Sequence, residues 1–115
     1  MDDLITDTNA AMLRPYVHIL LHLVVPISVA RLSWKNRWPT AALIMLATMA
    51  VDLDHLLAVP VYDPCRCSIG FHPLHSVWAI ASYGALSLFR RTRLWGIGLL
   101  IHMALDLIDC LWMRT

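Results

Sequence analysis

Four apolar stretches, each free of lysine and arginine and each bordered by charged residues, place the strongest constraint on the fold of this chain. They cover residues 16–30, 38–59, 72–89 and 94–113. Crossing the ~30 Å hydrocarbon core of a bilayer takes about 20 helical residues at a rise of ~1.5 Å each. Because a backbone in lipid must satisfy its own hydrogen bonds, each stretch is predicted to be a transmembrane helix.

Composition and connections define how these stretches can be arranged. Hydrophobic residues make up 59% of the 115 residues and charged residues only 15%, which is unusual for a soluble domain. The short connections force neighbouring helices to run antiparallel. We therefore predict an all-α protein, an integral membrane four-helix bundle that forms one domain over residues 1–115. Small residues on the third stretch are compatible with a homodimer: Ser82, Gly84, Ala85 and Ser87.

Basic residues are distributed unevenly between the two ends of this predicted bundle. The loops after the first and third stretches carry Arg31, Lys35, Arg37, Arg90, Arg91 and Arg93, whereas the opposite side holds only Arg14, Arg66 and Arg114. By the positive-inside rule the first set faces the cytoplasm, so both termini and the loop 60–71 lie outside. Residues 1–7 carry acids rather than a basic region, so no signal peptide is expected. No basic face or stripe suggests a nucleic-acid partner.

Ten ionisable residues lie inside or at the edge of the apolar stretches. They are His18, His22, His55, His72, His75, His102, Asp52, Asp54, Asp106 and Asp109. An aspartate at the centre of a membrane helix costs on the order of 3 kcal/mol, so each requires a compensating role. Alternating topology brings the polar parts of all four helices to one level, whichever side is outside. The sequence therefore predicts one polar site near one membrane face, on the side of the termini.

The spacing of these residues favours metal binding. Pairs three or four residues apart share a helical face: His18 with His22, Asp52 with His55, His72 with His75, and His102 with Asp106. Imidazole and carboxylate ligands suit divalent zinc, manganese or iron. The predicted ligands are His22, Asp52, Asp54, His55, His72, His75, His102 and Asp106. A set of this size fits two ions better than one.

Several of these residues can also be explained by structural roles that need no metal. His18, beside Tyr16 at a helix end, is expected to be interfacial rather than a ligand. Asp109 could snorkel or cap at the outer border, and Asp63 is expected to be a turn residue. The cluster as a whole could be an interhelical hydrogen-bond network or a proton pathway.

Three cysteines lie on the predicted outer side. Cys65 and Cys67 are in the loop, and Cys110 is near the end of the fourth stretch. In an oxidising compartment one of the loop cysteines can bond Cys110. A bond between Cys65 and Cys67 would close a very tight ring and is disfavoured.

Four motifs, taken in order, resemble those of a known family. They are His22, Asp52-Leu53-Asp54-His55, His75-Ser76 and His102 followed by Asp106. This arrangement resembles the inner-membrane metal-dependent hydrolases called LexA-binding, inner-membrane-associated hydrolases, of which the chain looks like a compact relative. The resemblance implies a metal site, a hydrolase activity and a place in the bacterial inner membrane.

We predict a metal-dependent hydrolase that acts on a lipid-linked phosphoester at the outer interface. Bound metal would activate a water and neutralise charge on a phosphoryl oxygen. Asp54 or Asp109 is the candidate base, and Arg66 is the candidate for binding the head-group phosphate. The alternatives are a membrane di-iron oxidase, which would require His18 as a ligand, and a non-enzymatic transition-metal carrier.

Overall fold

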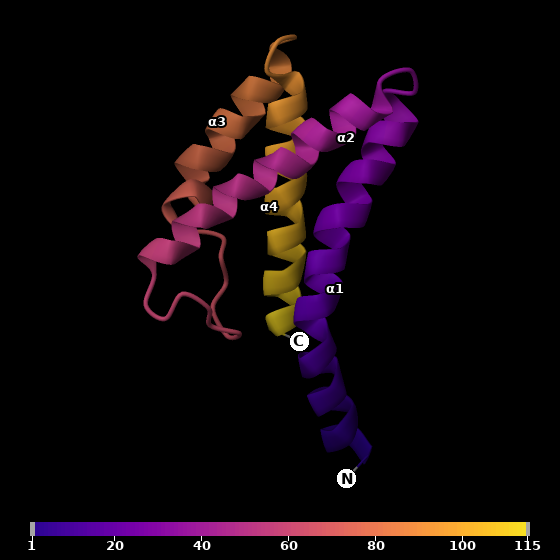
Figure 1. Ribbon diagram of the computed structural model, residues 1–115. Coiled ribbons are helices and arrows are strands. Elements are labelled where there is room, and N and C mark those ends of the chain that lie inside the picture. The colour runs from indigo at the N-terminus through magenta and orange to yellow at the C-terminus, as the bar shows by residue number, and fades with distance from the viewer. Residues whose placement is uncertain (1, 115) are drawn as a thin grey trace.

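The computed structural model describes residues 2–114, and within that range the chain is helical and contains no β-strand (Figure 1). The α-helices are α1 (Asp2–Ser33), α2 (Trp38–Ala47), α3 (Val77–Leu88) and α4 (Arg93–Met113), and the 3₁₀ helices are η1 (Thr48–Leu57) and η2 (Pro73–His75). The predicted all-α class is therefore confirmed.

The helices form an antiparallel bundle around α4. α2 continues into η1, and together they cross the bundle obliquely (Figure 1). α4 packs against α1, α2 and α3, and its lower half lies beside α1. Both termini and the loop 58–76 lie toward one end, and the two short connections lie at the other. The prediction that alternating topology brings the polar ends of the four stretches to one level is therefore confirmed.

Three helical segments of the described chain are long and apolar enough to cross a membrane. They are Asp3–Ser33, Trp38–Leu57 and Arg93–Met113. α3 is equally apolar but has only 12 residues, fewer than the ~20 of a full span. The composition and length of these helices support a membrane protein.

Two helices begin at places other than those predicted. α1 starts at Asp2 instead of residue 16, because no glycine or proline interrupts residues 2–14. α3 starts at Val77 instead of residue 72. His72 precedes a proline and is extended (φ −82°, ψ 147°), and the Ser76 hydroxyl caps the helix by accepting a bond of 3.2 Å from the Ala79 N–H. His75 therefore lies in the short 3₁₀ helix η2, outside the segments long enough to cross a membrane.

Close approach of α4 to its neighbours positions the polar site. A Cβ at Gly96 would clash with the backbone of Ser87, and one at Gly98 would lie 2.9 Å from the Thr48 side chain. Glycine at these two positions lets α4 approach α3 and η1 closely. The approach at Gly98 brings the following turns of α4 against η1. On α3, by contrast, a Cβ at Gly84 would meet nothing within 4 Å among the described residues, so the homodimer surface stays a prediction.

A disulfide fixes the loop 58–76 to α4. Cys67 bonds Cys110 with a Cα–Cα distance of 5.1 Å, and Cys65 is free and exposed. This confirms the expected pairing of one loop cysteine with Cys110. Asp63 is a turn residue as predicted, since its Oδ1 accepts a bond of 2.9 Å from the Cys65 N–H.

Candidate metal centre

Four donor atoms from η1, η2 and α4 meet at the first part of the site, here called the four-donor group. They come from Asp52, His75, His102 and Asp106, each of which offers one ligand atom within 4.8 Å of the others. His75 Nε2 is 3.2 Å from Asp52 Oδ1 and 3.0 Å from Asp106 Oδ2; for His102 Nε2 these distances are 3.0 and 3.3 Å. Metal–ligand bonds of about 2.0–2.2 Å separate neighbouring ligands by about 3.0–3.5 Å. The spacing of the four atoms matches that of ligands around one ion.

A second set, the three-donor group, lies on the other side of the same carboxylate. His18 Nε2 and His22 Nε2 are 3.2 and 3.3 Å from Asp106 Oδ1. His22 Nδ1 donates to the His18 carbonyl at 2.8 Å, which leaves the lone pair of a neutral ring on Nε2. His18, expected at the interface rather than among the ligands, thus belongs to a possible metal-binding set. Asp106 offers one oxygen to each group.

Several atoms in these groups and in the neighbouring Asp109 are buried without a hydrogen-bond partner among residues 2–114. They are His22 Nε2, His75 Nε2, His102 Nδ1, Asp106 Oδ2 and Asp109 Oδ1. Leaving such an atom unsatisfied costs about 1–3 kcal/mol. The Nε2 atoms of His22 and His75 and Oδ2 of Asp106 approach their neighbours closely without the alignment of a hydrogen bond. This arrangement fits atoms that share a cation.

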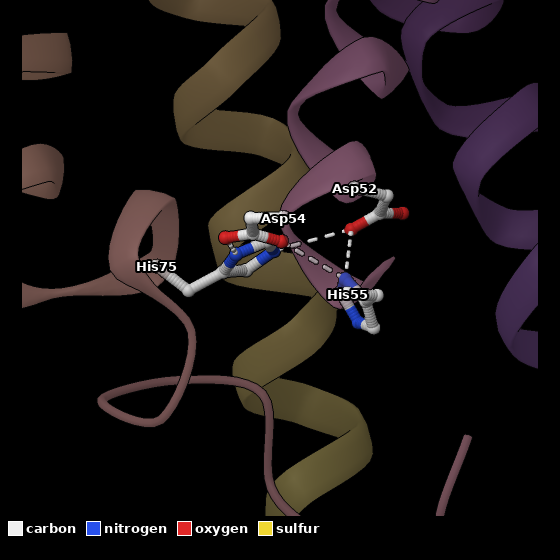
Figure 2. Close-up of side chains that lie close together, drawn as sticks. All are labelled: Asp52, Asp54, His55 and His75. Atoms are coloured by element: carbon white, nitrogen blue, oxygen red, sulfur yellow. Dashed lines mark hydrogen bonds and ion pairs between the residues drawn. The ribbon is translucent and has the colours of Figure 1, made fainter. Parts of the chain in front are cut away.

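Asp54 lies against the His75 ring and orients it (Figure 2). Its Oδ2 accepts bonds of 2.9 Å from His75 Nδ1 and from the Leu74 N–H, so His75 Nε2 is turned toward the four-donor group. Its Oδ1 accepts a bond of 3.0 Å from His55 Nδ1. Asp54 was predicted as both ligand and base. It can join a further set with Asp52, His55 and His75, but both its oxygens already have partners.

His55 and His72 form the outer edge of the site. His55 Nδ1 is 3.5 Å from Asp52 Oδ1, and its ring stacks on His72 with a centroid distance of 3.8 Å. His72 is 3% exposed and joins none of the possible metal-binding sets of the described residues. Burial, and then the neighbouring His55, lower the pKa of His72. The predicted ligand His72 is therefore brought beside the site, where a neutral ring packs against His55.

The charge around His75 defines the alternative to a metal. Burial lowers the pKa of this imidazole, but contacts with Asp106, Asp52 and Asp54 outweigh it and raise the pKa to about 10. Without a cation, the carboxylates would therefore hold a proton on His75. A metal ion and this proton compete for the same position.

A cavity of about 240 Å³, here called the polar cavity, opens beside both groups. Its charged and imidazole lining consists of Arg14, His18, Asp52, His55, Asp63, Arg66, His72 and Asp109. Arg14 Nε is 3.4 Å from Asp109 Oδ1, and its guanidinium also donates to the Pro64 carbonyl. Arg66 donates to the carbonyls of Pro60 and Val61 at 2.9 and 3.1 Å. Two arginines thus line the cavity onto which the candidate ligands open.

Arg14 is a site residue that the sequence reasoning missed. It precedes His18 by four residues and His22 by eight, so all three lie on one face of α1. That spacing was the available signal. The predicted phosphate-binding residue, Arg66, and the predicted base, Asp109, both line the polar cavity.

An apolar groove of about 470 Å³ adjoins the polar cavity. Its lining is Met49, Ala50, Leu53 and Leu56 together with four residues that also line the polar cavity, Asp52, His55, Val61 and Tyr62. The shared residues join a charged compartment to an apolar one.

A family model described as a family of unknown function (DUF6122) matches residues 12–113. The chain belongs to this family. No curated protein matches the chain, and no solved structure matches it. The match to DUF6122 does not connect the chain with the inner-membrane hydrolases, so that resemblance stays a prediction.

The donor set of this DUF6122 member could hold a metal ion. It contains imidazole and carboxylate but no thiolate, since Cys67 and Cys110 are bonded to each other and the free Cys65 joins no donor set of the described residues. The matched range contains every donor of both groups. The buried histidine and aspartate clusters that could hold a metal ion thus lie within the part of the chain that the family model matches.

Proposed function

We propose that this chain is a metal-dependent hydrolase of the bacterial inner membrane that acts on a lipid-linked phosphoester. The observation that carries the proposal is the placement of Asp106 between the two histidine-containing groups. Its oxygens lie 3.0 Å from His75 Nε2 and 3.2 Å from His18 Nε2. A carboxylate in this position can bridge two ions, which is the arrangement of two-metal phosphoester hydrolases.

The two groups would hold the two ions in different surroundings. The four-donor group would take one ion and the three-donor group the other, with Asp106 common to both. Zinc, manganese and iron all suit these ligands. When bound, the ions supply an activated water and neutralise charge on the phosphoryl oxygens. The three-donor group has fewer protein ligands, so it has more room for water.

Residues around the ions would position the substrate and move the proton. Arg14 and Arg66 would bind the phosphate oxygens in the polar cavity. In hydrolysis, water attacks phosphorus, the bond to the leaving alcohol oxygen breaks, and the proton of the water passes through a base to that oxygen. Asp109, which lines the cavity 4.0 Å from His18 Nδ1, is our choice of base. Asp54 is our choice of positioning residue, because its contacts orient His75.

The lipid part of the proposal rests on the apolar groove. A head group in the polar cavity would leave its chain beside Leu53 and Leu56, which are exposed toward the surroundings of the bundle. The Cys67–Cys110 disulfide lies at this end, as expected for an oxidising compartment. The basic loops at the other end give the same orientation by the positive-inside rule. Two independent criteria thus favour a site on the outer face.

A membrane di-iron oxidase is the second candidate. The inclusion of His18 favours it, because that reading needs His18 and His22 as a pair of ligands. The two arginines in the polar cavity favour the hydrolase, because an oxidase would need an apolar substrate tunnel at this place. A metal carrier would need a path through the bundle to the opposite end.

The test is metal content by mass spectrometry on detergent-purified protein, wild type beside Asp106→Asn, with Asp63→Asn as control. We expect stoichiometric metal in the wild type and in Asp63→Asn, and none in Asp106→Asn, where the amide keeps the shape but loses the charge. Phosphate release from phosphatidic acid and from a long-chain isoprenyl phosphate then tests hydrolysis. Iron with an absorbing chromophore and no phosphate release would favour the oxidase. No metal in any variant after reconstitution would leave only the polar network.

A further inference from the structure

At the end of the bundle opposite the metal centre, the chain carries cations and no acid. All eight aspartates lie within residues 2–7, 52–63 and 106–109. The two short connections and the helix ends beside them hold six of the nine basic residues (Figure 1). No acidic residue occurs in residues 8–51 or 64–105. This end therefore has a local charge without an internal counter-ion.

Four of these cations line one cavity of about 430 Å³, here called the arginine cavity. It is bounded by Arg37, Arg90, Arg91 and Arg93 together with Trp34, Ile44, Leu94 and Trp95. The single hydrogen bond of these arginine side chains within residues 2–114 joins Arg93 Nε to the Ser87 carbonyl at 3.2 Å. None of the four forms an ion pair in the described chain. Their guanidinium groups are therefore available to an external anion.

The position of the arginine cavity relative to the membrane selects the anion. On this side the spanning segments have their ends at Ser33, Trp38 and Arg93. Arg93 lines the cavity, and Ser33 and Trp38 are the chain neighbours of the lining residues Trp34 and Arg37, so the cavity lies at head-group level. Trp34 and Trp95 are the residue type that gathers at this level. Guanidinium groups bind phosphate through paired hydrogen bonds, and basic pockets between membrane helices bind anionic head groups.

We propose that the arginine cavity binds the phosphate of an anionic phospholipid from the adjoining leaflet. The phosphate lies among the guanidinium groups, and the acyl chains leave along Ile44 and Leu94, which line the same cavity. The lipid joins the α1–α2 connection to the α3–α4 connection and neutralises charges that otherwise repel one another. This binding is independent of the hydrolase proposal and needs no metal.

The experiment is native mass spectrometry of detergent-purified full-length protein titrated with phosphatidylglycerol or phosphatidylcholine. We compare wild type with R90Q/R93Q, which removes two charges from the cavity. The control is R31Q/K35Q, which removes two charges from the same end but none from the cavity lining. We expect wild type to prefer phosphatidylglycerol by about tenfold or more, R90Q/R93Q to lose this preference, and R31Q/K35Q to keep it.

Each of the following outcomes overturns the proposal. Equal loss in both double variants would mean that diffuse charge attracts the lipid without a site. Competition by inorganic phosphate at concentrations similar to those of the lipid would mean that the cavity takes a free anion. If R90Q/R93Q does not fold, Arg37→Gln and Arg91→Gln are measured singly, and an unchanged preference in both contradicts the proposal. Thermal unfolding in detergent reports whether each variant is folded.

Discussion

The two ends of this bundle are both rich in ionisable residues, but they are built in opposite ways. At one end, imidazoles and carboxylates are buried at short distances, with His75 0% and Asp106 4% exposed. At the other, the arginines of the arginine cavity are exposed and have no acidic partners in the described chain. A buried charge needs a specific partner, whereas an exposed one is satisfied by water.

The difference between the two ends predicts different kinds of function. Donor atoms held by four helical elements and a disulfide have fixed separations, which suits an ion with defined bond lengths. Exposed arginines on two connections can adjust to a larger and less defined ligand such as a lipid head group. Substitutions at the metal end should therefore act on metal content and stability, and substitutions at the arginine end should not.

Among the substitutions that test the difference between the two ends, His102→Ala is expected to have the largest effect. It removes one of the two imidazoles of the four-donor group and should cost that group its ion, so metal content falls from two ions to one. Phosphoester hydrolysis should fall by about a thousandfold or more, because charge on the phosphoryl oxygens is no longer neutralised. Metal content and kcat are measured together. Lys35→Gln, at the opposite end, should change neither, and full metal content in His102→Ala would contradict the assignment.

The disulfide exists at one end only, so removing it should destabilise the two ends unequally. The double change Cys67→Ser with Cys110→Ser removes a cross-link between residues 43 apart in sequence. It should lower the free energy of unfolding by about 2–4 kcal/mol. Thermal unfolding in detergent measures this, and metal retention should weaken because the loop carries His75. Cys65→Ser, which alters the free exposed cysteine, is the matched control. Identical melting of all three proteins would contradict a stabilising role.

Most of the fold was predictable because the bilayer restricts what an apolar stretch can become. Four stretches without lysine or arginine predicted four antiparallel helices, and this is what the chain forms. The start of α3 was wrong because hydropathy does not register the proline after His72 or the cap at Ser76. The division of the second stretch into α2 and the 3₁₀ helix η1 was not predicted either, because hydropathy does not distinguish the two helix types.

The site was predictable as a cluster but not as a set of roles. Helical spacing correctly paired His18 with His22 and His102 with Asp106, because residues four apart share a face. The orienting contacts of Asp54 could not be foreseen, since they depend on the Leu74 N–H in a turn twenty residues away. His18 was set aside because its position in the sequence resembles that of an interfacial residue, whereas packing of α1 on α4 brings it to Asp106.

A smaller effect is expected from Asp54→Asn, which tests whether this residue binds metal or orients a ligand. If Asp54 orients His75, the amide keeps part of the contact with the Leu74 N–H and metal affinity should fall by about 10–100-fold. Competition with a chelator of known affinity measures the change. Asp63→Asn, in the loop 58–76 that also contains Leu74, should leave the metal affinity unchanged. Complete loss of one ion, as in His102→Ala, would show instead that Asp54 is a ligand.

The smallest effect is expected from Arg66→Gln, because it removes a substrate contact and leaves both metal groups intact. The KM for a lipid phosphoester should rise by about tenfold with kcat little changed, since the lost contact binds ground state and transition state alike. Arg66 also donates to the carbonyls of Pro60 and Val61, so metal content is measured to separate loss of binding from disorder of the loop. Arg114→Gln, an exposed cation at the same end, is the matched control. An equal rise in KM in both variants would mean that the overall positive charge of this end attracts the substrate, without a specific contact from Arg66. The metal end would then bind its ligand in the same unspecific way as an exposed charged surface.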